Sequence, residues 1–561
     1  MIIMVGFIFK KKSRGYNYYY AGENHRVNGK CVRKWEIRLG TFDNIVKIMS
    51  QGMLLPDEVF ATPYGLYSAF VEIAKEIRFV EIIDQAFPKR NQGLTIGDYF
   101  LLGILARLTK PRTKNSIQKW YKSKEIEKIY SVDQKYLTVQ NYWNNMEPLD
   151  FEKVNDLHHS LLKSIGKEYP LQTSYIYFDP TNFHTFIETL SESSTIPKHG
   201  SSKKKRFDLP IVNLALAVTK GDGIPAYHKT YSGNINDVTF FKQNLDALIK
   251  HLKKKTTSKK IVIVFDKGNN AKEVFDQIAG YKEPKVKFIG SLRPSTQEKL
   301  FSIPVEQLID EYETDSGNVV KYKEVRVKVY GKSYRGVLTY DDNTYRKKWN
   351  TWINNMDKIM NEVKSFLNNK LNIKKWRDKE AVEKKLNKIV SKKKMKNVLC
   401  VEVNGEYGNL WVSLYCDIAA AKKKMNTWGK NLVFSSLEQE DIVEIIKGYR
   451  LKNDIEECFK ILNNSYLLSV RPINHWNDQM IKAHMATCVF GLIIIQLLRK
   501  KLREANIKMS INEVFERLME IQLVRLYYKN KRTVYKLGTM DKRTRKLAKA
   551  VGVRLKLECS D

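Results

Sequence analysis

Two acidic residues stand at the ends of apolar runs in this 561-residue chain. Asp179 follows Tyr-Ile-Tyr-Phe and Asp266 closes the run IVIVFD, so both lie where a strand is expected to finish. Open α/β sheets build their sites at the carboxyl ends of strands. Two carboxylates brought together repel one another unless a cation separates them, and Mg²⁺ prefers such oxygen ligands. The pair therefore predicts a metal site for phosphate chemistry. The alternative for Asp179 is a turn opened by Asp-Pro, and Pro180 is expected to end the strand.

A third acid lies in the stretch GYRLKNDIEECFKILNN (448–464), for which the apolar spacing predicts one long helix over about 438–463. The polar residues spaced to share one face of this helix are Tyr449, Lys452, Glu456 and Asn463. An adjoining apolar stripe would seat the helix on a sheet, and its members are Leu451, Ile455, Phe459 and Leu462. The alternative is an exposed polar face with no part in the chemistry.

The elements that must position these acids follow a mixed pattern. Apolar and alternating runs predict strands, with a helix through 237–252, and such a mixture over about 120 residues indicates an α/β sheet. The expected strands are 175–179, 209–218, 224–233, 261–266 and 286–292. The sequence pattern then changes. Hairpins are expected at 318–340 and 398–415, a Lys-rich helical stretch at 344–396 and a strand at 431–436. Residues 56–165 look helical, and the Asn28-Gly29 dipeptide predicts a hairpin near the N-terminus.

The charge composition of the chain indicates which class of molecule it binds. Lys and Arg number 98 against 61 Asp and Glu, a formal net charge of +37, which favours a polyanion such as DNA or RNA; the alternative is a general excess of lysine on solvated helices. The six cysteines show no zinc spacing. The N-terminal charges follow the apolar run, unlike a signal peptide, and the longest apolar run, Met485–Leu498, is short for a bilayer and predicts a core helix. We expect a cytoplasmic, nucleoid-associated protein with no membrane partner.

One segment mixes basic residues with aromatic ones. Residues 106–128 contain Trp120 and Tyr121 among lysines and arginines. This pattern fits a helix that faces DNA and fits an ordinary amphipathic helix equally well.

Seven pieces of the chain, in order and spacing, resemble insertion-sequence transposases with an Asp-Asp-Glu active site. More narrowly, the chain resembles the subgroup marked by Tyr-x2-Arg-x3-Glu-x6-Lys, from GYNYYY near the N-terminus to about residue 500. The sharper pieces are FDPTNFHTF (178–186), SKKKRFDLPIVNLALAV (202–218), IPAYHKTYSGNINDVTFF (224–241), VFDKGNNAKE (264–273), KFIGSLRPS (287–295), YRLKNDIEECFKIL (449–462) and RPINHWNDQMIKAHM (471–485).

The resemblance implies an α/β fold with a ribonuclease-H-like catalytic core, a β-rich insertion, a β-hairpin N-terminus and helical flanking regions. The expected parts are an N-terminal β-hairpin region at 1–50, a helical DNA-binding region at 51–170, the first part of the core at 171–299, the insertion at 300–436, the second part of the core at 437–500 and a basic C-terminal region at 501–561.

The resemblance also implies the site. Asp179, Asp266 and Glu456 match the catalytic acids that hold two Mg²⁺ ions about 3.5–4 Å apart, with Mn²⁺ as a substitute. It implies cleavage of the element's ends and strand transfer into target DNA by in-line displacement, without a covalent enzyme intermediate. Two positions differ from the signature, because Lys452 occupies the position of its Arg and Asn463 the position of its Lys. Lys460 is a candidate to replace the charge lost at position 463.

The residues expected to contact DNA are Tyr449, Lys452, Lys460, Asn463, Trp428, Lys203, Lys204, Lys205 and Arg206. Trp428 matches an aromatic that stacks a flipped base in relatives, and its alternative is a packed side chain. His475 and His484 are expected to be structural. Asn182 and Asp237 are expected to serve turns, and the alternative for both is a hydrogen-bonding role near the site.

The sequence therefore predicts an enzyme, a DNA transposase that acts as a homodimer on terminal inverted repeats and target DNA. Two alternatives remain open at this point: a domesticated DNA-binding protein with altered catalysis, and a nuclease of the same fold.

Overall fold

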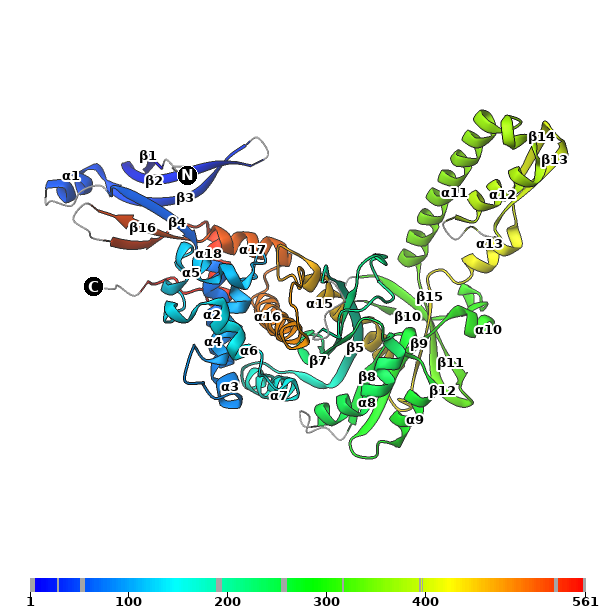
Figure 1. The fold of residues 1–561 in the computed structure, drawn as a ribbon, viewed down its shortest axis with the longest axis horizontal. Helices are drawn as coiled ribbons and strands as arrows, with labels where there is room; N and C mark the ends of the chain where they lie inside the picture. Colours follow the sequence, from blue (N-terminus) through cyan, green and yellow to red (C-terminus); the bar gives the residue numbers. More distant parts are fainter. Residues whose placement is uncertain are drawn as a thin grey trace. The chain divides into compact units, whose positions relative to one another are not determined.

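The protein has a mixed α/β structure, seen here in a computed structural model (Figure 1). The structure describes residues 6–27, 30–50, 56–187, 194–253, 260–314, 317–392, 395, 397–528 and 533–557. The chain forms two compact units. Unit 1 comprises Met1–Ile261 and Lys452–Asp561, and unit 2 comprises Val262–Leu451. The predicted Asn28-Gly29 turn lies outside the described residues.

Unit 1 has a helical core built around α16 (Asp478–Glu504), which packs against helices from the first part of the chain. All residues of Met485–Leu498 are buried, so the predicted core helix is confirmed. The helix has the length and apolar composition of a membrane span, yet 94% of its apolar window is buried inside the fold. The other helices of this part are α2 (Gly65–Glu76), α3 (Phe79–Ala86), α4 (Ile96–Leu105), α5 (Ile117–Ser123), α6 (Val139–Met146), α7 (Phe151–Glu168), α17 (Ile511–Glu520) and α18 (Lys542–Ala550).

Two small antiparallel sheets belong to the same unit. The first has the order β1-β2-β3 and is followed by α1 (Phe42–Ser50); the second has the order β17-β16-β4 and joins chain segments far apart in sequence. Apolar side chains of β3 and β16 form one small core, which explains how the N-terminal strands attach to the rest of unit 1. The strands are β1 (Phe7–Ser13), β2 (Tyr16–Val27), β3 (Lys30–Thr41), β4 (Glu58–Pro63), β16 (Gln522–Tyr527) and β17 (Thr533–Leu537).

Three further strands of unit 1 pair in the antiparallel order β5-β6-β7, and α15 packs on β5, β6 and α16. The apolar run of β6 is buried along nearly its whole length, which is why a continuous apolar stretch marked it in the sequence. The elements are β5 (Gln172–His184), β6 (Ile211–Lys220), β7 (Pro225–Ser232), α8 (Asp237–Lys253) and α15 (Asn453–Asn463).

The expectation that Pro180 ends its strand is wrong, because β5 continues through it to His184. The Pro180 carbonyl accepts a hydrogen bond from Lys203 Nζ. In an antiparallel strand the N–H and C=O of one residue point to the same side. The missing N–H of Pro180 therefore faces the lysine and costs the β5–β6 ladder nothing.

Unit 2 contains strands in the order β10-β11-β12-β15-β9-β8, and the boundary between the units falls inside β8. Helix α14 packs on β9 and β15, and α9 packs on β9. The elements are β8 (Lys260–Val264), α9 (Lys272–Gly280), β9 (Lys285–Leu292), α10 (Glu298–Phe301), β10 (Asp310–Glu313), β11 (Val319–Val329), β12 (Lys332–Asp341), β15 (Lys430–Ser435) and α14 (Ile442–Arg450).

Between β12 and β15 the chain builds a helix-and-hairpin segment with its own apolar core. The core is formed by α11, α12 and the hairpin β13–β14, including Phe366, Leu386 and Leu410. Its elements are α11 (Asp342–Lys370), α12 (Lys379–Val390), β13 (Leu399–Glu406), β14 (Asn409–Cys416) and α13 (Ile418–Met425).

The single long helix expected over 438–463 is also wrong, since the chain turns at Leu451 and Lys452 between α14 and α15. The buried residues explain the break. Ile446 of α14 and Ile455 of α15 are nine positions apart, about two and a half helical turns, so a continuous helix would point them to opposite sides. The turn lets each helix bury its own apolar face. Tyr449 and Glu456 therefore do not share one helical face.

Candidate active site

Asp266 lies just beyond the buried strand β8 in unit 2, and a tyrosine holds its side chain. The Asp266 carboxylate accepts a hydrogen bond from the Lys267 backbone N–H at 2.8 Å. The Tyr449 hydroxyl lies 3.2 Å from Asp266 Oδ1 and 2.7 Å from the buried Ser291 Oγ. A hydroxyl that donates to the carboxylate can accept from the serine. Asp266, expected to be a catalytic acid, and Tyr449, expected to contact DNA, are thus in contact although they lie 183 positions apart in the chain.

The loop after Asp266 is tied to β9, the strand that contains Ser291. Asn270 Nδ2 donates to the Ser291 carbonyl oxygen at 2.9 Å, and Asn269 is buried. Gly268 has no atom within 4 Å of where a side chain would begin, so the backbone there is open to an approaching group. This arrangement suits a loop that lets a phosphate come close.

Asp179 lies in unit 1, half-buried on β5 opposite Leu216 of β6. Its charge is felt on β7, where burial raises the pKa of Tyr231, and the charges of Asp237 and Asp179 add to the effect. The Tyr231 hydroxyl donates to Asp237 Oδ1 at 3.3 Å. Asp179 of β5 and Asp237 of α8 therefore both lie near Tyr231.

The basic loop 203–206 is fastened beside Asp179. Asn182 Nδ2 donates to the Ser201 carbonyl at 3.0 Å, and Asn182 Oδ1 accepts from the Lys203 backbone N–H at 3.2 Å. Lys203 Nζ also lies 3.7 Å from Asp237 Oδ2. Asn182 therefore anchors the loop rather than serving a turn. The basic side chains of this loop are all exposed, as binding to phosphates requires: Lys203, Lys204, Lys205 and Arg206.

Glu456 is exposed on α15 in unit 1, with Lys452 Nζ 3.8 Å from its Oε1. Lys460 pairs with Glu457 instead. Asn463 donates through Nδ2 to the Phe459 carbonyl at 2.9 Å, and among the described residues its buried Oδ1 finds no hydrogen-bond partner. Lys452 thus places a positive charge beside Glu456, whereas the Asn463 side chain hydrogen-bonds within its own helix.

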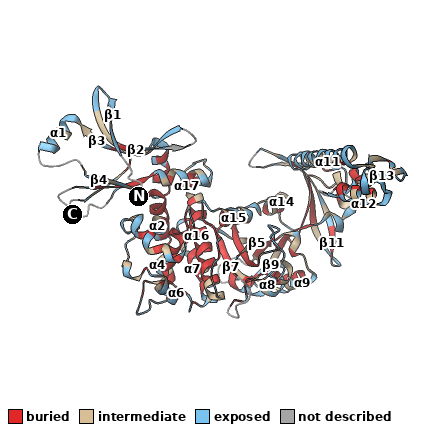
Figure 2. Cartoon of the chain, turned by 45° about the horizontal axis from the view of Figure 1, so that its top comes forward, coloured by how far each residue is buried: buried red, intermediate tan, exposed pale blue. Residues whose placement is uncertain are grey.

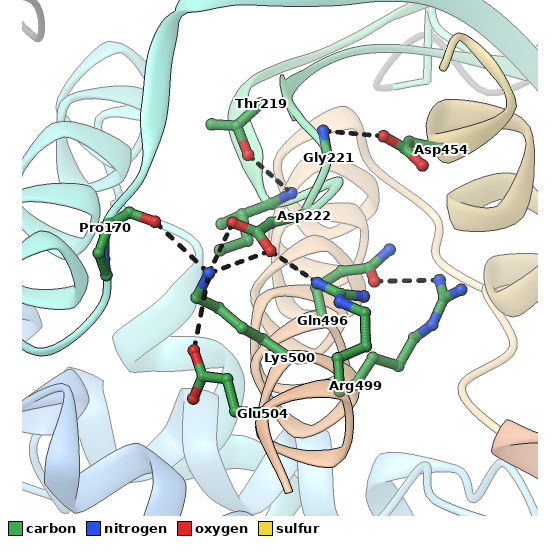
Figure 3. Close-up of polar contacts among 11 residues, drawn as sticks. Pro170, Thr219, Gly221, Asp222, Asp454, Gln496, Arg499, Lys500 and Glu504 are labelled. Atoms are coloured by element: carbon green, nitrogen blue, oxygen red, sulfur yellow. Dashed lines mark hydrogen bonds and ion pairs between the residues drawn. The ribbon is translucent and has the colours of Figure 1, made fainter. Parts of the chain in front are cut away.

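A network that the sequence did not indicate holds α15 in place, and Figure 3 shows its core. The Gly221 backbone N–H donates to Asp454 Oδ2 at 3.0 Å, and Cys458 Sγ donates to the Gly223 carbonyl at 3.3 Å. Gln496 Nε2 of α16 donates to Cys458 Sγ at 3.0 Å. The turn between β6 and β7 is therefore locked between α15 and α16, which fixes the backbone that carries Glu456.

Asp222, in the middle of that turn, is the charged centre of the network. It lies 3.0 Å from Lys500 Nζ and 2.6 Å from an Arg503 guanidinium nitrogen, and the side chains of Asp222 and Lys500 are each only 13% exposed. Nearby, burial raises the pKa of Asp454, while Arg499 and Arg503 partly offset that rise. In the sequence, Gly221-Asp222-Gly223 indicates a turn but not the ion pairs of Asp222.

Trp428 is half-buried in unit 2 among aromatic side chains of α11. Its ring centroid lies 6.1 Å from that of Tyr345, 6.4 Å from Trp349 and 5.9 Å from Trp352. These contacts match the packed alternative; the stacking role stays a prediction.

His484 is buried and His475 is half-buried in unit 1, as expected for structural residues. Burial lowers the pKa of His475 to about 3, and its ring lies 4.9 Å from that of Trp143. Burial also lowers the pKa of His484, whose Nε2 pairs with the Val470 carbonyl at 2.7 Å. Both rings are neutral at physiological pH.

The chemistry of the acids suits Mg²⁺, which prefers carboxylate oxygens. Among the described residues, however, the structure gathers no group of three or more His, Cys, Asp or Glu around one ion position. Asp179 and Glu456 belong to unit 1 and Asp266 to unit 2, so a ligand set made of all three stays a prediction.

Comparisons with known proteins give little identity. No protein-family model matches the chain, and no curated protein matches it. Six chains of solved structures do match. One is described as the cryo-EM structure of a piggyBac transposase synaptic complex with hairpin DNA; it is 11% identical with a TM-score of 0.35, over 82% of this chain and 79% of that chain. A likeness of this size does not establish a shared function.

Proposed function

We propose that this protein is a DNA transposase that cleaves the ends of its insertion sequence and joins them to target DNA. The observation that carries the proposal is the contact between Tyr449 and Asp266, 3.2 Å from hydroxyl to carboxylate. Tyr449 opens the signature motif on α14, and Asp266 is the second acid expected at the site. A tyrosine that served only packing would not need its hydroxyl on that carboxylate, so the contact supports a shared site.

Each side chain receives a role from its contacts. Tyr449 orients the Asp266 carboxylate, and Lys452 lies next to Glu456 with a charge that can meet a phosphate. The exposed loop 203–206 supplies cations for the DNA backbone. Asp179, Asp266 and Glu456 would hold Mg²⁺, which when bound neutralises charge on the reacting phosphodiester. A dimer that bridges two ends is part of the proposal.

The test is a cleavage and joining assay with DNA from the termini that flank the gene, in Mg²⁺. Asp266→Ala should abolish both activities while end binding remains. The matched control is Asp276→Ala, an exposed aspartate of the same unit paired with Lys332. If Asp266→Ala still cut the ends, the site assignment would be wrong.

The same assay separates the two rival functions. A nuclease of this fold would cleave without joining, and a domesticated DNA-binding protein would bind without cleaving. The departures at Lys452 and Asn463 favour the second rival, and restoring the signature with Lys452→Arg and Asn463→Lys should raise activity if they weaken an active enzyme.

A further inference from the structure

The N-terminal sheet has two unlike faces. On one face, Trp35 and Ile37 are buried against Val524 and Leu526 of β16, in the same unit. Because side chains alternate along a strand, the residues between them point away from that core. Strand pairing places one set together on this opposite side, called here the outer face: Phe7, Phe9, Lys11, Tyr16, Tyr18, Tyr20, Arg33, Glu36 and Arg38. Strict alternation would put Arg33 on the side of Trp35, but a bulge between Glu23 and Asn24 shifts the register, and Arg33 lies over the Phe9 ring.

Cations lie on aromatic rings across the outer face. Arg33 Cζ lies 3.9 Å from the Phe9 ring centroid, and Arg38 Cζ lies 3.8 Å from that of Tyr18. Lys11 Nζ lies 5.0 Å from the Tyr20 centroid. A guanidinium stacked on a ring is held in place and keeps its N–H donors at the edge for a phosphate or a base.

Gly22 makes this arrangement possible. A Cβ at position 22 would lie 2.8 Å from Arg33 Nη1, 2.9 Å from the Trp35 carbonyl oxygen and 3.0 Å from the Phe9 ring. Any side chain there would push Arg33 off its ring. The glycine therefore lets an arginine of β3 reach across β2 to an aromatic ring of β1.

The outer face is accessible and strongly positive. Figure 2 colours β1 largely as exposed, and Tyr16 and Phe7 are 65% and 37% exposed. Residues 6–25 and 30–41 contain eight Lys or Arg against two Glu. One of these, Glu36, lies 2.6 Å from Lys11 Nζ. Exposed aromatic rings interleaved with cations fit a polyanion with groups to stack on or hydrogen-bond.

The other aromatic and basic segment is not available for this purpose. In 106–128, Trp120 and Tyr121 are buried, and burial lowers the pKa of Lys114 to about 7. A DNA-facing role for these two rings is therefore excluded.

We propose that the outer face of β1–β3 docks in a groove of duplex DNA, with Arg33 and Arg38 as its anchors. This inference rests on the proposed function, which makes DNA the partner. Three strands about 4.8 Å apart span a backbone width of about 10 Å, and the major groove is about 12 Å wide. The stacked arginines would contact phosphates or guanine edges, and Tyr16, at the end of the hairpin, would meet the backbone.

The experiment measures binding of the full chain to a fluorescein-labelled 30-base-pair duplex by anisotropy, over a series of salt concentrations. The double variant R33Q/R38Q should raise Kd at least about tenfold and reduce the slope of log K against log salt by about 1.8. The control R346Q/K135Q removes two exposed, ion-paired cations elsewhere and should leave Kd within about twofold. R33K/R38K keeps the charge and checks that the sheet still folds.

The outcomes separate this inference from the proposed function. If the wild-type chain does not bind duplex DNA, both fall. If it binds and R33Q/R38Q binds equally well, only the role of the outer face falls. A loss seen with a single-stranded 30-mer but not with the duplex would overturn the assignment to a groove.

Discussion

Tyr449 illustrates how one hydroxyl can orient a charged side chain. Its contacts with Asp266 and Ser291 join a helix, a strand end and a strand interior of unit 2. Hydrogen bonds to charged groups contribute about 1.5–3 kcal/mol, more than neutral ones. Tyr449 therefore reaches the candidate site through its contact with Asp266. It does not share a helical face with Glu456.

Removing that hydroxyl should slow cleavage without weakening DNA binding. Tyr449→Phe keeps the ring and loses the contact with Asp266, so we expect the single-turnover cleavage rate to fall about 10- to 100-fold. Tyr466→Phe, which changes an exposed tyrosine, is the control. A Tyr449→Phe rate equal to wild type would show that Asp266 does not depend on this contact.

Asp454 should make the protein less stable as the pH rises. Burial raises its pKa in the folded state, so the folded chain holds this proton more tightly than the unfolded chain. The free energy of unfolding therefore falls as pH rises from the unfolded pKa, about 3.9, through the raised folded pKa, and is level above it. Asp454→Asn keeps an oxygen for the Gly221 N–H and should remove this decline. Urea unfolding from pH 4 to 8 measures it, and parallel wild-type and variant curves would refute it.

At the residue scale, the three acids and Tyr449 could be chosen as candidates from the sequence because each stands in a recognisable local motif. The Asp222 network carried no such signal, since its members lie on three elements distant in the chain. Only folding brings Asp222 next to Lys500. For the same reason the sequence could not favour the hydrogen-bonding role of Asn182 over a turn role, because its partners are in a later loop.

At the scale of elements, strands were the most predictable. β6 and β9 lie within a few residues of their expected ranges, and both strands are mostly buried. For β6 the reason is a nearly continuous apolar run, which has few other uses. The break between α14 and α15 was missed, although the opposite phases of Ile446 and Ile455 record it. The continuation of β5 past Pro180 could not be foreseen, since it depends on which side of Pro180 faces β6 in the folded sheet.

The β6–β7 turn should stabilise the seat of α15 through Asp222. Asp222→Ala leaves Lys500 without its closest carboxylate in a mostly buried setting, and we expect a loss of about 3 kcal/mol in the free energy of unfolding. Glu152→Ala breaks the exposed pair with Lys229 and should cost less than about 1 kcal/mol. Urea titration compares the two, and equal costs would contradict the proposed weight of the network.

At the scale of the whole molecule, the segment from α11 to α13 should fold alone. Its core includes Ile359, Phe366, Leu386 and Leu410, all buried within the segment itself. A fragment of residues 342–425 should give helical circular dichroism and a cooperative thermal transition. Leu386→Asp in the fragment should abolish that transition. A wild-type fragment without a cooperative transition would show that the segment depends on the rest of unit 2.

The division of the chain also has a consequence for biosynthesis. Unit 1 is made of the first and last parts of the chain, and its central helix α16 comes from the last part. After α4 ends at Leu105, the ribosome must add about 370 residues before α16 begins at Asp478, and the apolar faces of α2 and α4 lack that partner meanwhile. At 5–20 residues per second the delay is about 20–75 s. The nascent protein is therefore a natural client for chaperones until α16 emerges.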